Sequence, residues 1–498
     1  MSYVAYNSAT GNDLIDSITW GGYWDLTTSV GGAVGTITYS LDDGYWGGDG
    51  WFNYEISAIR DALEVWSNVC AIDFVEVDPG NPNDSNYWEN ITFVALSEST
   101  MSYLFGSGTL GAHDTPGDET YLSYYNYLAD YYYPLGGYYN WEGTGWTEDG
   151  LQQGGYGFAT LIHEIGHGLG FAHPHDNGGI STVMDGVSDS LYDYGTDELN
   201  QGIFTTMSYN DGWMSEFGVI IDYDYGVQGT PMAFDIYLAQ ILYGANEDYN
   251  VGANAYYLPE ENASGTFWSC IWDAGGEDTI SAIGISENCI INLNDAPLTG
   301  ENAGGFVSYA NNVMGGFTIA YGVVIENAIG GVKNDSITGN EAANDLVGGN
   351  GKDTLYGGNG KDILAGGAGA DELEGGAGKD VLYGGNGADT FVFTATRQSS
   401  ATATSADVIK DFIRGTDTID LSAIDASTKL SGNNTFTFDG TTTFGTSSYG
   451  EVYYKKFDLS GTSNDYTMVY IDTDNDPAAE MTIKLMGLHN LTASDFVL

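Results

Sequence analysis

The stretch from Gly348 to Val392, "GGNGKDTLYGGNGKDILAGGAGADELEGGAGKDVLYGGNGADTFV", repeats one nine-residue pattern five times without a gap. Each repeat reads G-G-x-G-x-D-x-U-x, where U is an apolar residue. A flexible glycine linker would not keep an aspartate and an apolar residue at fixed positions. We expect the first six residues of each repeat to form a tight turn and the last three a short strand with its apolar side chain pointing inward. The repeats therefore predict a parallel β-roll.

The same repeats predict calcium binding. Calcium takes six to eight hard oxygen ligands, and stacked turns supply such oxygens from backbone carbonyls and aspartate carboxylates. Two looser copies precede the perfect ones, from Gly330 and from Gly339, and the second has Asn344 at the aspartate position. Seven coils are therefore expected over residues 330–392. The predicted charged ligands are Asp335, Asp353, Asp362, Asp371, Asp380 and Asp389.

The charge of the whole chain narrows the classes of partner. Its 498 residues include 12 Lys and Arg against 69 Asp and Glu, a formal net charge of −57. Such a chain lacks the cations that neutralise phosphate, which excludes nucleic acid and anionic membranes as expected partners. It also repels itself unless cations bind. We find no basic and apolar signal segment at the N-terminus and no run of 18 apolar residues, so neither a cleaved signal nor a membrane span is expected.

The three cysteines, Cys70, Cys270 and Cys289, do not form a disulfide framework or a thiolate metal site. A Cys270–Cys289 bridge and three buried thiols both stay open.

Residues before about 245 differ in pattern from the repeats. Apolar residues at helical spacing predict helices over 57–69 and 158–170, and short alternating stretches predict strands over 35–40 and 90–96. A third helix is expected over 230–244, with Thr230 as N-cap, Pro231 at the first helical position and Gly244 past the end. This region is therefore expected to be a mixed α and β domain.

One predicted helix contains "HEIGHGLGFAH", from His163 to His173. Histidines four residues apart lie on one side of a helix, and Gly170 suits the left-handed turn that would bring His173 back to them. Three imidazoles with an open fourth position are typical of a catalytic zinc, and Glu164 is placed to take a proton from a water that zinc activates. Histidines in an ordinary helix are the alternative, but the glutamate, the glycine and the third histidine coincide here. The pattern matches the metzincin signature.

Further motifs resemble the serralysin branch of the metzincins. "TTMSYND" offers a methionine turn, and Pro174 follows the third histidine, as in that family. The resemblance implies that Met207 forms the hydrophobic floor of the site. It also implies that Tyr209 is a weak zinc ligand that swings away and hydrogen-bonds the oxyanion. His175 stands where relatives have glycine, and we expect it to be a loop residue and not a ligand.

The resemblance extends to calcium and export. "WDAGGED", "VIENAIGG" and "ADVIKDFIRGTDTIDLSAI" resemble family segments around the roll and imply the further calcium ligands Asp273, Gly275, Gly276, Asp278, Glu326 and Asp407. The resemblance also implies type I export directed by an uncleaved C-terminal signal, with "DFVL", residues 495–498, as the matching tail; this tail is also expected to be the last β-strand.

Two segments keep open interpretations. "DTDNDPAAE" at Asp472 begins like an EF-hand loop, but Pro477 and Ile483 stand where that loop needs glycine and glutamate. We interpret it as a turn, with calcium binding left open. The tyrosine-rich segment 121–141 is expected either to line a substrate cleft or to form strand surface.

The sequence thus predicts an α+β protein: a metzincin zinc-protease domain followed by an all-β parallel β-roll (RTX) domain. The expected parts are a catalytic domain over 1–245, with a short propeptide left open, a strand segment with a calcium loop over 246–329, the roll over 330–392, and a C-terminal β segment with the secretion signal over 393–498. The expected function is that of a monomeric, secreted, calcium-stabilised zinc endopeptidase, which binds extracellular polypeptides extended along an edge strand. A calcium-dependent RTX surface or adhesion protein is the alternative, and a polysaccharide-active RTX enzyme is a third hypothesis.

Overall fold

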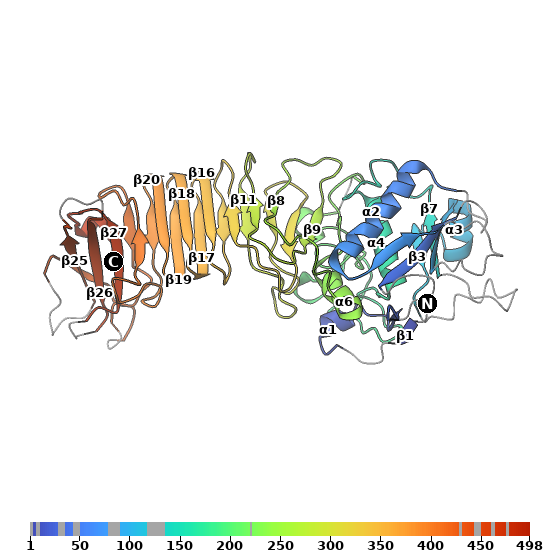
Figure 1. Ribbon diagram of the computed structural model, residues 1–498, viewed down its shortest axis with the longest axis horizontal. Helices are drawn as coiled ribbons and strands as arrows, with labels where there is room; N and C mark the ends of the chain where they lie inside the picture. The colour runs from blue at the N-terminus through green and yellow to red at the C-terminus, as the bar shows by residue number, and fades with distance from the viewer. Residues whose placement is uncertain are drawn as a thin grey trace.

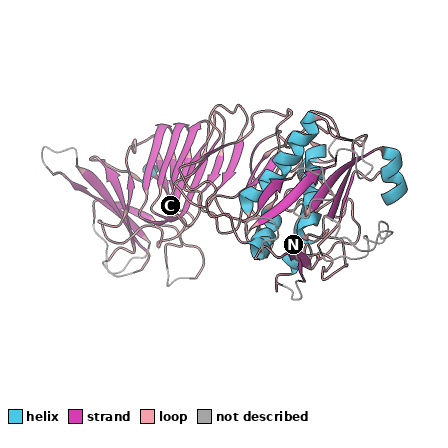
Figure 2. Ribbon diagram, turned by 45° about the vertical axis from the view of Figure 1, so that its right-hand side comes forward, coloured by secondary structure: helices cyan, strands magenta, loops and turns pink. Residues whose placement is uncertain are grey.

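The computed structural model describes residues 3–5, 10–27, 35–42, 50–77, 90–116, 135–219, 222–427, 431–442, 450–459, 464–474 and 478–498. The molecule is elongated, with the helices gathered at one end and strands stacked in series toward the other (Figures 1 and 2). The tyrosine-rich segment lies mostly within 117–134, outside the described residues, so both interpretations of it stay untested.

The helical end contains a five-stranded sheet of order β4-β3-β5-β7-β6. Its strands are β3 (Thr36–Leu41), β4 (Asp73–Glu76), β5 (Ile91–Leu96), β6 (Gly111–His113) and β7 (Leu135–Asn140). All neighbours are parallel except β6, which pairs antiparallel to β7 at the edge. Helices α2 (Asn53–Val69) and α4 (Tyr156–Leu169) pack together, and α3 (Glu98–Phe105) contacts β7. The predicted mixed domain, with both of its first two helices, is confirmed.

The third predicted helix begins later than expected. Helix α6 spans Ala233–Tyr243, its N-cap is Met232, and Gly244 follows its end as predicted. The expectation of Thr230 as N-cap is wrong because the Asp235 carboxylate, at the third helical position, accepts the backbone N–H of Met232 at 2.9 Å. This bond satisfies the N-cap N–H and sets the start of the helix.

The N-terminal segment is built into the same domain. Strands β1 (Tyr3–Ala5) and β2 (Gly22–Trp24) pair with each other, and α1 (Asp13–Asp16) lies between them in the sequence. The Trp24 indole donates to the Gly168 carbonyl at 2.9 Å, and the Trp20 N–H donates to the Gly170 carbonyl at 2.9 Å. Residues 10–27 therefore brace the end of α4.

The repeats form a parallel β-roll, as predicted. Successive strands alternate between two sheets of 11 and 10 strands, so each strand pairs with the one two repeats away, as Leu355 does with Leu373. The inward apolar residues of the repeats are at most 1% exposed. The coil strands are β14 (Asn327–Ile329), β15 (Ser336–Thr338), β16 (Asp345–Asn350), β17 (Thr354–Gly360), β18 (Ile363–Gly369), β19 (Glu372–Gly378), β20 (Val381–Gly387) and β21 (Thr390–Val392).

The expected three-residue strand is found at β15 and β21, but the expected division of the repeat is wrong for β16 to β20, which are longer. Strands β17 to β20 each span seven residues and continue through the glycines, with Gly358 paired to Gly376. A Cβ added at Gly376 would lie 2.0 Å from the Gly358 carbonyl oxygen. The glycines therefore let neighbouring coils approach closely enough to pair backbone to backbone.

Further strands extend both sheets. Those before the roll are β8 (Ala255–Tyr257), β9 (Trp268–Ile271), β10 (Thr279–Ser281), β11 (Cys289–Asn292), β12 (Ser308–Ala310) and β13 (Gly316–Ile319). Those after it are β22 (Asp407–Ile409), β23 (Thr418–Asp420), β24 (Thr437–Gly440), β25 (Glu451–Phe457), β26 (Tyr466–Asp472), β27 (Met481–Met486) and β28 (Phe496–Val497). Short helices complete the fold: α5 (Met214–Phe217), η2 (Thr196–Glu198) and η3 (Ala493–Asp495).

The tail 495–498 contains the expected last strand, because β28 pairs with β23. All three cysteines are buried and free, so the expectation of buried thiols is confirmed and the Cys270–Cys289 bridge is absent. Among the described residues, no helix combines the length and the apolar character needed to cross a membrane.

Candidate metal centre

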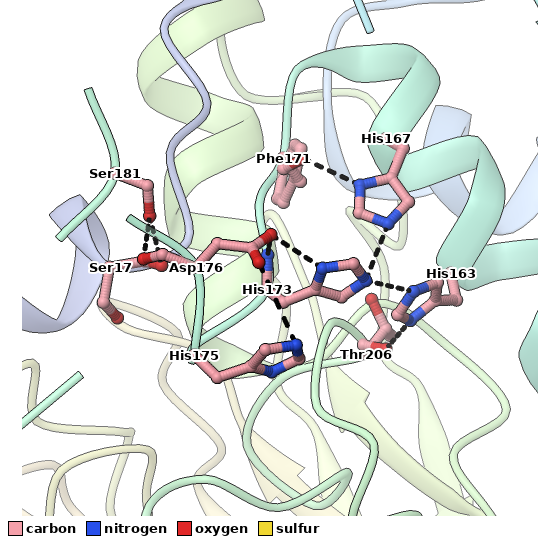
Figure 3. Close-up of polar contacts among 9 residues, drawn as sticks. All are labelled: Ser17, His163, His167, Phe171, His173, His175, Asp176, Ser181 and Thr206. Carbon is pink, nitrogen blue, oxygen red and sulfur yellow. Dashed lines mark hydrogen bonds and ion pairs between the residues drawn. The ribbon is translucent and has the colours of Figure 1, made fainter. Parts of the chain in front are cut away.

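Helix α4 and the turn after it bring three histidines together. Gly170 ends the helix in the left-handed conformation, with φ 102° and ψ 20°, and the chain reverses as the sequence predicts. The Nε2 atom of His173 then lies 3.2 Å from Nε2 of His163 and 3.0 Å from Nε2 of His167 (Figure 3). The structure thus joins the predicted trio.

The hydrogen bonds of the Nδ1 atoms, on the outer side of these rings, show which ring nitrogen carries the proton. Nδ1 of His163 lies 2.7 Å from the Thr206 carbonyl oxygen, and Nδ1 of His167 lies 2.9 Å from that of Phe171. A carbonyl only accepts, so each Nδ1 carries the proton and each neutral ring presents a bare Nε2. Burial, the largest cause, lowers the pKa of His163 to about 3 and that of His167 well below its usual value, which keeps both rings neutral.

Bare nitrogens this close repel one another unless a cation lies between them. Tetrahedral zinc with Zn–N bonds of about 2.0–2.1 Å separates its nitrogen ligands by about 3.4 Å. The observed spacings of 3.0 and 3.2 Å are within a few tenths of an ångström of that value. Three imidazoles with acceptors on their outer nitrogens are the donor set of a catalytic zinc. The residues present therefore fit the ion.

The third histidine is oriented by a carboxylate. Asp176 accepts from Nδ1 of His173 at 2.7 Å and from the His173 backbone N–H at 3.2 Å. The loop is tied to the N-terminal segment by the Ser181 hydroxyl, which donates to the Ser17 carbonyl at 2.9 Å (Figure 3). The position of His173 thus depends on residues that the sequence pattern did not identify.

Glu164 lies beside the trio without a partner. Its side chain is buried, and Oε2 has no hydrogen-bond partner among the described residues. Burial raises the pKa of this carboxyl to about 8. A cation held by the histidines would favour the charged form and lower the pKa again. The edge strand β6 presses on it: a Cβ at Gly111 would lie 2.5 Å from Cγ of Glu164, so only glycine fits there.

The methionine turn lies under the helix, as predicted. Met207 is fully buried, and a Cβ at Gly166, between the two helical histidines, would lie 2.8 Å from its sulfur. Asp235 of α6 holds this turn by accepting from the Thr205 hydroxyl and from the Thr206 N–H, each at 2.6 Å. A buried carboxylate in a distant helix thereby fixes the carbonyl that orients His163.

Tyr209 and His175 flank His173. The ring centroids of Tyr209 and His173 are 4.7 Å apart, and the His175 ring stacks on His173 at 4.9 Å. Tyr209 remains 40% exposed, and burial followed by the Glu164 charge raises its pKa. His175 lies in the loop, outside the trio, but its ring offers a ligand atom within 4.8 Å of those of His173 and Asp176, so its expected role as a non-ligand stays a prediction.

A cleft of about 370 Å³ opens beside the trio and Glu164. Its walls come from β6, α4 and the segment after Met207, and Asp211 adds a second, half-buried carboxylate. The lining includes Leu110, Gly111, Tyr156, Thr160, His163, Glu164, Leu191, Tyr209, Asp211 and Gln228.

His113 is another residue that the sequence analysis missed. It lies half-buried beside α4, a Cβ at Gly168 would lie 2.5 Å from its Cε1, and desolvation of the ring lowers its pKa to about 4. The sequence does not single out Gly111 or Gly168, because the role of each depends on a close contact with a residue elsewhere in the domain, Glu164 for Gly111 and His113 for Gly168.

The predicted roll ligands form a ladder. Along the roll, the Oδ1 atom of an aspartate accepts the backbone N–H of the residue that holds the same position two repeats earlier. Asp371, for example, accepts the N–H of Asp353 at 2.9 Å. The Oδ2 atoms of Asp353, Asp362, Asp371, Asp380, Asp389 and Asp407 are buried without a partner in the described part of the chain. Asp335 differs, because its two oxygens accept from Cys289 and Gly331. Each coil contributes at most one carboxylate, and the coil with Asn344 contributes none, so a calcium here needs carbonyl oxygens as well.

The predicted calcium loop before the roll also comes together. Glu326 accepts the Asp278 N–H at 2.8 Å, and Asp273 accepts from Gly275 at 2.8 Å. Burial, with charges of Asp273 and Glu326, raises the pKa of Asp278 to about 6. Gly276 packs so closely on Gly252 that a Cβ would lie 2.1 Å from that carbonyl oxygen.

Known proteins match both halves of this architecture. A family model described as matrixin matches residues 36–187, and one described as the peptidase M10 serralysin C terminal matches residues 235–498. Serralysin C of Dickeya chrysanthemi is 35% identical, with 97% of this chain and 88% of the relative covered. Serralysin of Proteus mirabilis is 32% identical over 68% of this chain and 65% of the relative, and metallopeptidase AprA of Pseudomonas marginalis is 35% identical over 76% and 69%. A match that runs through both the histidine site and the roll shows that the chain belongs to the serralysin family of zinc metalloendopeptidases.

Proposed function

We propose that His163, His167 and His173 hold the catalytic zinc and that Glu164 is the general base of peptide hydrolysis. The observation that carries this proposal is the convergence of three bare Nε2 atoms beside a buried carboxylate with an unpartnered oxygen. Zinc, when bound, supplies Lewis acidity, which makes water nucleophilic at neutral pH and polarises the peptide carbonyl.

Residues of the chain carry out the proton transfers and stabilise the oxyanion. Glu164 takes the proton of the attacking water at its carboxylate and returns it to the leaving amine. Tyr209, exposed at the cleft, donates its hydroxyl proton in a hydrogen bond to the oxyanion. Met207 and Asp235 touch neither water nor substrate and act by positioning the histidines.

The substrate is expected to bind as an extra strand. β6 is the edge of the five-stranded sheet, and Gly111 on it lines the cleft beside Glu164. An extended polypeptide that pairs with this edge places a carbonyl over the zinc position without any specific side chain. This geometry favours an endopeptidase that acts on unfolded segments of proteins.

Casein hydrolysis tests the proposal against the adhesin alternative. The enzyme is assayed in saturating calcium with a zinc-selective chelator, then after zinc is returned. We expect hydrolysis to be lost and then restored, while the roll stays folded in calcium. A surface protein with an inactive domain would show no hydrolysis in any of these conditions.

We also propose that the predicted roll and loop aspartates bind calcium and that export precedes folding. A chain of formal charge −57 with buried aspartates repels itself where calcium is scarce. Extracellular modules bind calcium with dissociation constants of about 10⁻⁴–10⁻³ M, which suits folding only outside the cell. The secreted location and the type I route belong to this proposal.

The C-terminal tail supports this order of events. Asp495 is fully buried and accepts from the Gly415 N–H at 2.9 Å, and Phe496 is only 7% exposed. An export apparatus that reads residues 495–498 would need them before they dock on β23. Deleting residues 496–498 should block secretion and leave the refolded enzyme active; normal secretion of the shortened chain would contradict the export proposal.

A further inference from the structure

The hairpin between β26 and β27 gathers three carboxylates outside the roll. β26 ends at Asp472, β27 begins at Met481, and the strands pair antiparallel up to Ile471 and Met481. One ligand oxygen from each of Asp472, Asp474 and Glu480 lies within 4.8 Å of the other two. The cluster belongs to the stretch that begins like an EF-hand loop.

Asp472 has a second, independent feature. It is 0% exposed, its Oδ1 accepts the Asp474 N–H at 2.7 Å, and its Oδ2 is buried without a hydrogen-bond partner among the described residues. A buried carboxylate oxygen without a partner is costly unless an ion satisfies it. Within the described residues, every other aspartate oxygen in this state belongs to a predicted calcium ligand: Asp278, Asp353, Asp362, Asp371, Asp380, Asp389 or Asp407.

The neighbouring groups hold the carboxylates of Asp472 and Glu480 in place. Glu480 accepts the Thr473 N–H at 2.7 Å, which turns its carboxylate toward the cluster. Glu451 stands directly opposite Asp472 in the β25–β26 pair, where like charges destabilise a sheet. Neither Asp472 nor Glu480 takes part in an ion pair with a described residue.

We propose that Asp472, Asp474 and Glu480 bind a calcium ion that fastens this hairpin. Calcium–oxygen distances of about 2.3–2.6 Å separate two opposed ligands by up to about 5 Å. The three ligand oxygens all lie within 4.8 Å of one another, close enough to share one calcium ion. An all-oxygen carboxylate set favours calcium over zinc. The glycine and glutamate that an EF-hand requires are missing at Pro477 and Ile483; here the proposed ligands are the last residue of β26, Asp474 just after it, and Glu480 just before β27.

The position of the hairpin gives the ion a structural role. β27 pairs with β22, which continues the sheet of the roll through β20. A calcium at this turn would therefore fasten the C-terminal end of the sheet onto the roll. It would act independently of the zinc centre and of peptide hydrolysis.

The test uses the full chain and calcium alone as the ligand. Asp472→Asn removes the unpartnered charge, Glu480→Gln is a second variant at a less buried position, and Asp458→Asn is the matched control, an exposed aspartate at the opposite end of β25. Bound calcium per chain and hydrogen exchange of residues 466–472 and 481–486 are measured with and without calcium.

Both variants should bind one calcium fewer than the parent, and the control should bind the full number. At a calcium concentration ten times the dissociation constant, the parent hairpin should exchange about tenfold more slowly than without calcium, and the variants should lose this protection. Exchange over 354–387 and peptidase activity should not change in Glu480→Gln. Unchanged calcium content in both variants, or equal protection of the parent hairpin by magnesium alone, would overturn the proposal.

Discussion

The proposed zinc centre and the proposed calcium sites of the roll are built in opposite ways. At the zinc centre, the imidazoles are held by fixed acceptors, the carbonyls of Thr206 and Phe171 and the carboxylate of Asp176. In the roll, the five perfect repeats each bring a buried carboxylate with one oxygen that has no partner among the described residues. Hydrogen bonds within the protein shape the first site before an ion binds. In the second, negative charge accumulates along these repeats, so we expect its fold to depend on the ions.

The largest effect should come from removing a zinc ligand. His163→Ala deletes one of three nitrogens and leaves a cavity beside Met207, so the centre should lose zinc. We expect kcat/KM for casein to fall by at least about 1000-fold, equivalent to about 4 kcal/mol of transition-state stabilisation. Zinc content and far-UV circular dichroism are measured together. His489→Ala, in the C-terminal region, is the control and should keep both zinc and activity.

The roll should respond to pH only when calcium is removed. Burial raises the pKa of Asp353 to about 6, of Asp362 to about 7 and of Asp407 to about 8 in the absence of an ion. The folded, metal-free roll then binds more protons than the unfolded chain, so its stability falls as pH rises from about 4 through these values.

In chelator, we therefore expect more β-structure at pH 5 than at pH 8, read by hydrogen exchange over 354–387. Saturating calcium should remove this loss at pH 8. A metal-free roll that is more ordered at pH 8 than at pH 5 would contradict the proposed charge repulsion. That result would not bear on the proposal for the zinc centre.

Tyr209→Phe should have an intermediate effect. A sole oxyanion donor contributes about 100–1000-fold to kcat, and zinc shares that role here, so we expect kcat to fall about 10–100-fold. Zinc content and KM should change little, because the phenyl ring keeps the packing on His173. Turnover equal to that of the parent would remove the proposed role of the hydroxyl.

The smallest effect on activity is expected at the support of the methionine turn. Asp235→Asn weakens the bonds from Thr205, Thr206 and Met232, and hydrogen bonds to a buried charge contribute about 1.5–3 kcal/mol. We expect the free energy of unfolding of the catalytic domain to fall by about 1–3 kcal/mol and kcat to fall only a few-fold. Asp222→Asn, an exposed change of the same kind, should be neutral in urea unfolding.

The sequence predicts the zinc trio well because the pattern is local. His163 and His167 share a helix face, and Gly170 and His173 follow within six residues, so helix geometry alone brings them together. The roll is predictable for the same reason, since each repeat carries its own aspartate and apolar residue. What failed there was strand length, because pairing through the glycines depends on the neighbouring coil.

The parts that the sequence did not predict depend on contacts between distant segments. Gly111 matters only because β6 presses on Glu164, and Asp235 only because α6 reaches the methionine turn. The start of α6 was misjudged for a related reason: the same carboxylate caps the helix and holds the turn. Asp472 looked like part of a broken EF-hand until the hairpin placed Glu480 beside it.

Glu164→Gln tests the central claim most directly. The amide keeps the shape of the buried side chain and does not touch the three histidines' nitrogens, so zinc should stay bound at the level of the parent. A general base contributes about 100–10,000-fold, and we expect casein hydrolysis to fall by that factor in a folded, zinc-loaded protein. Zinc content by mass spectrometry and initial hydrolysis rates are measured on the same sample. A zinc-loaded Glu164→Gln protein that retains more than a few per cent of the parental rate would contradict the account.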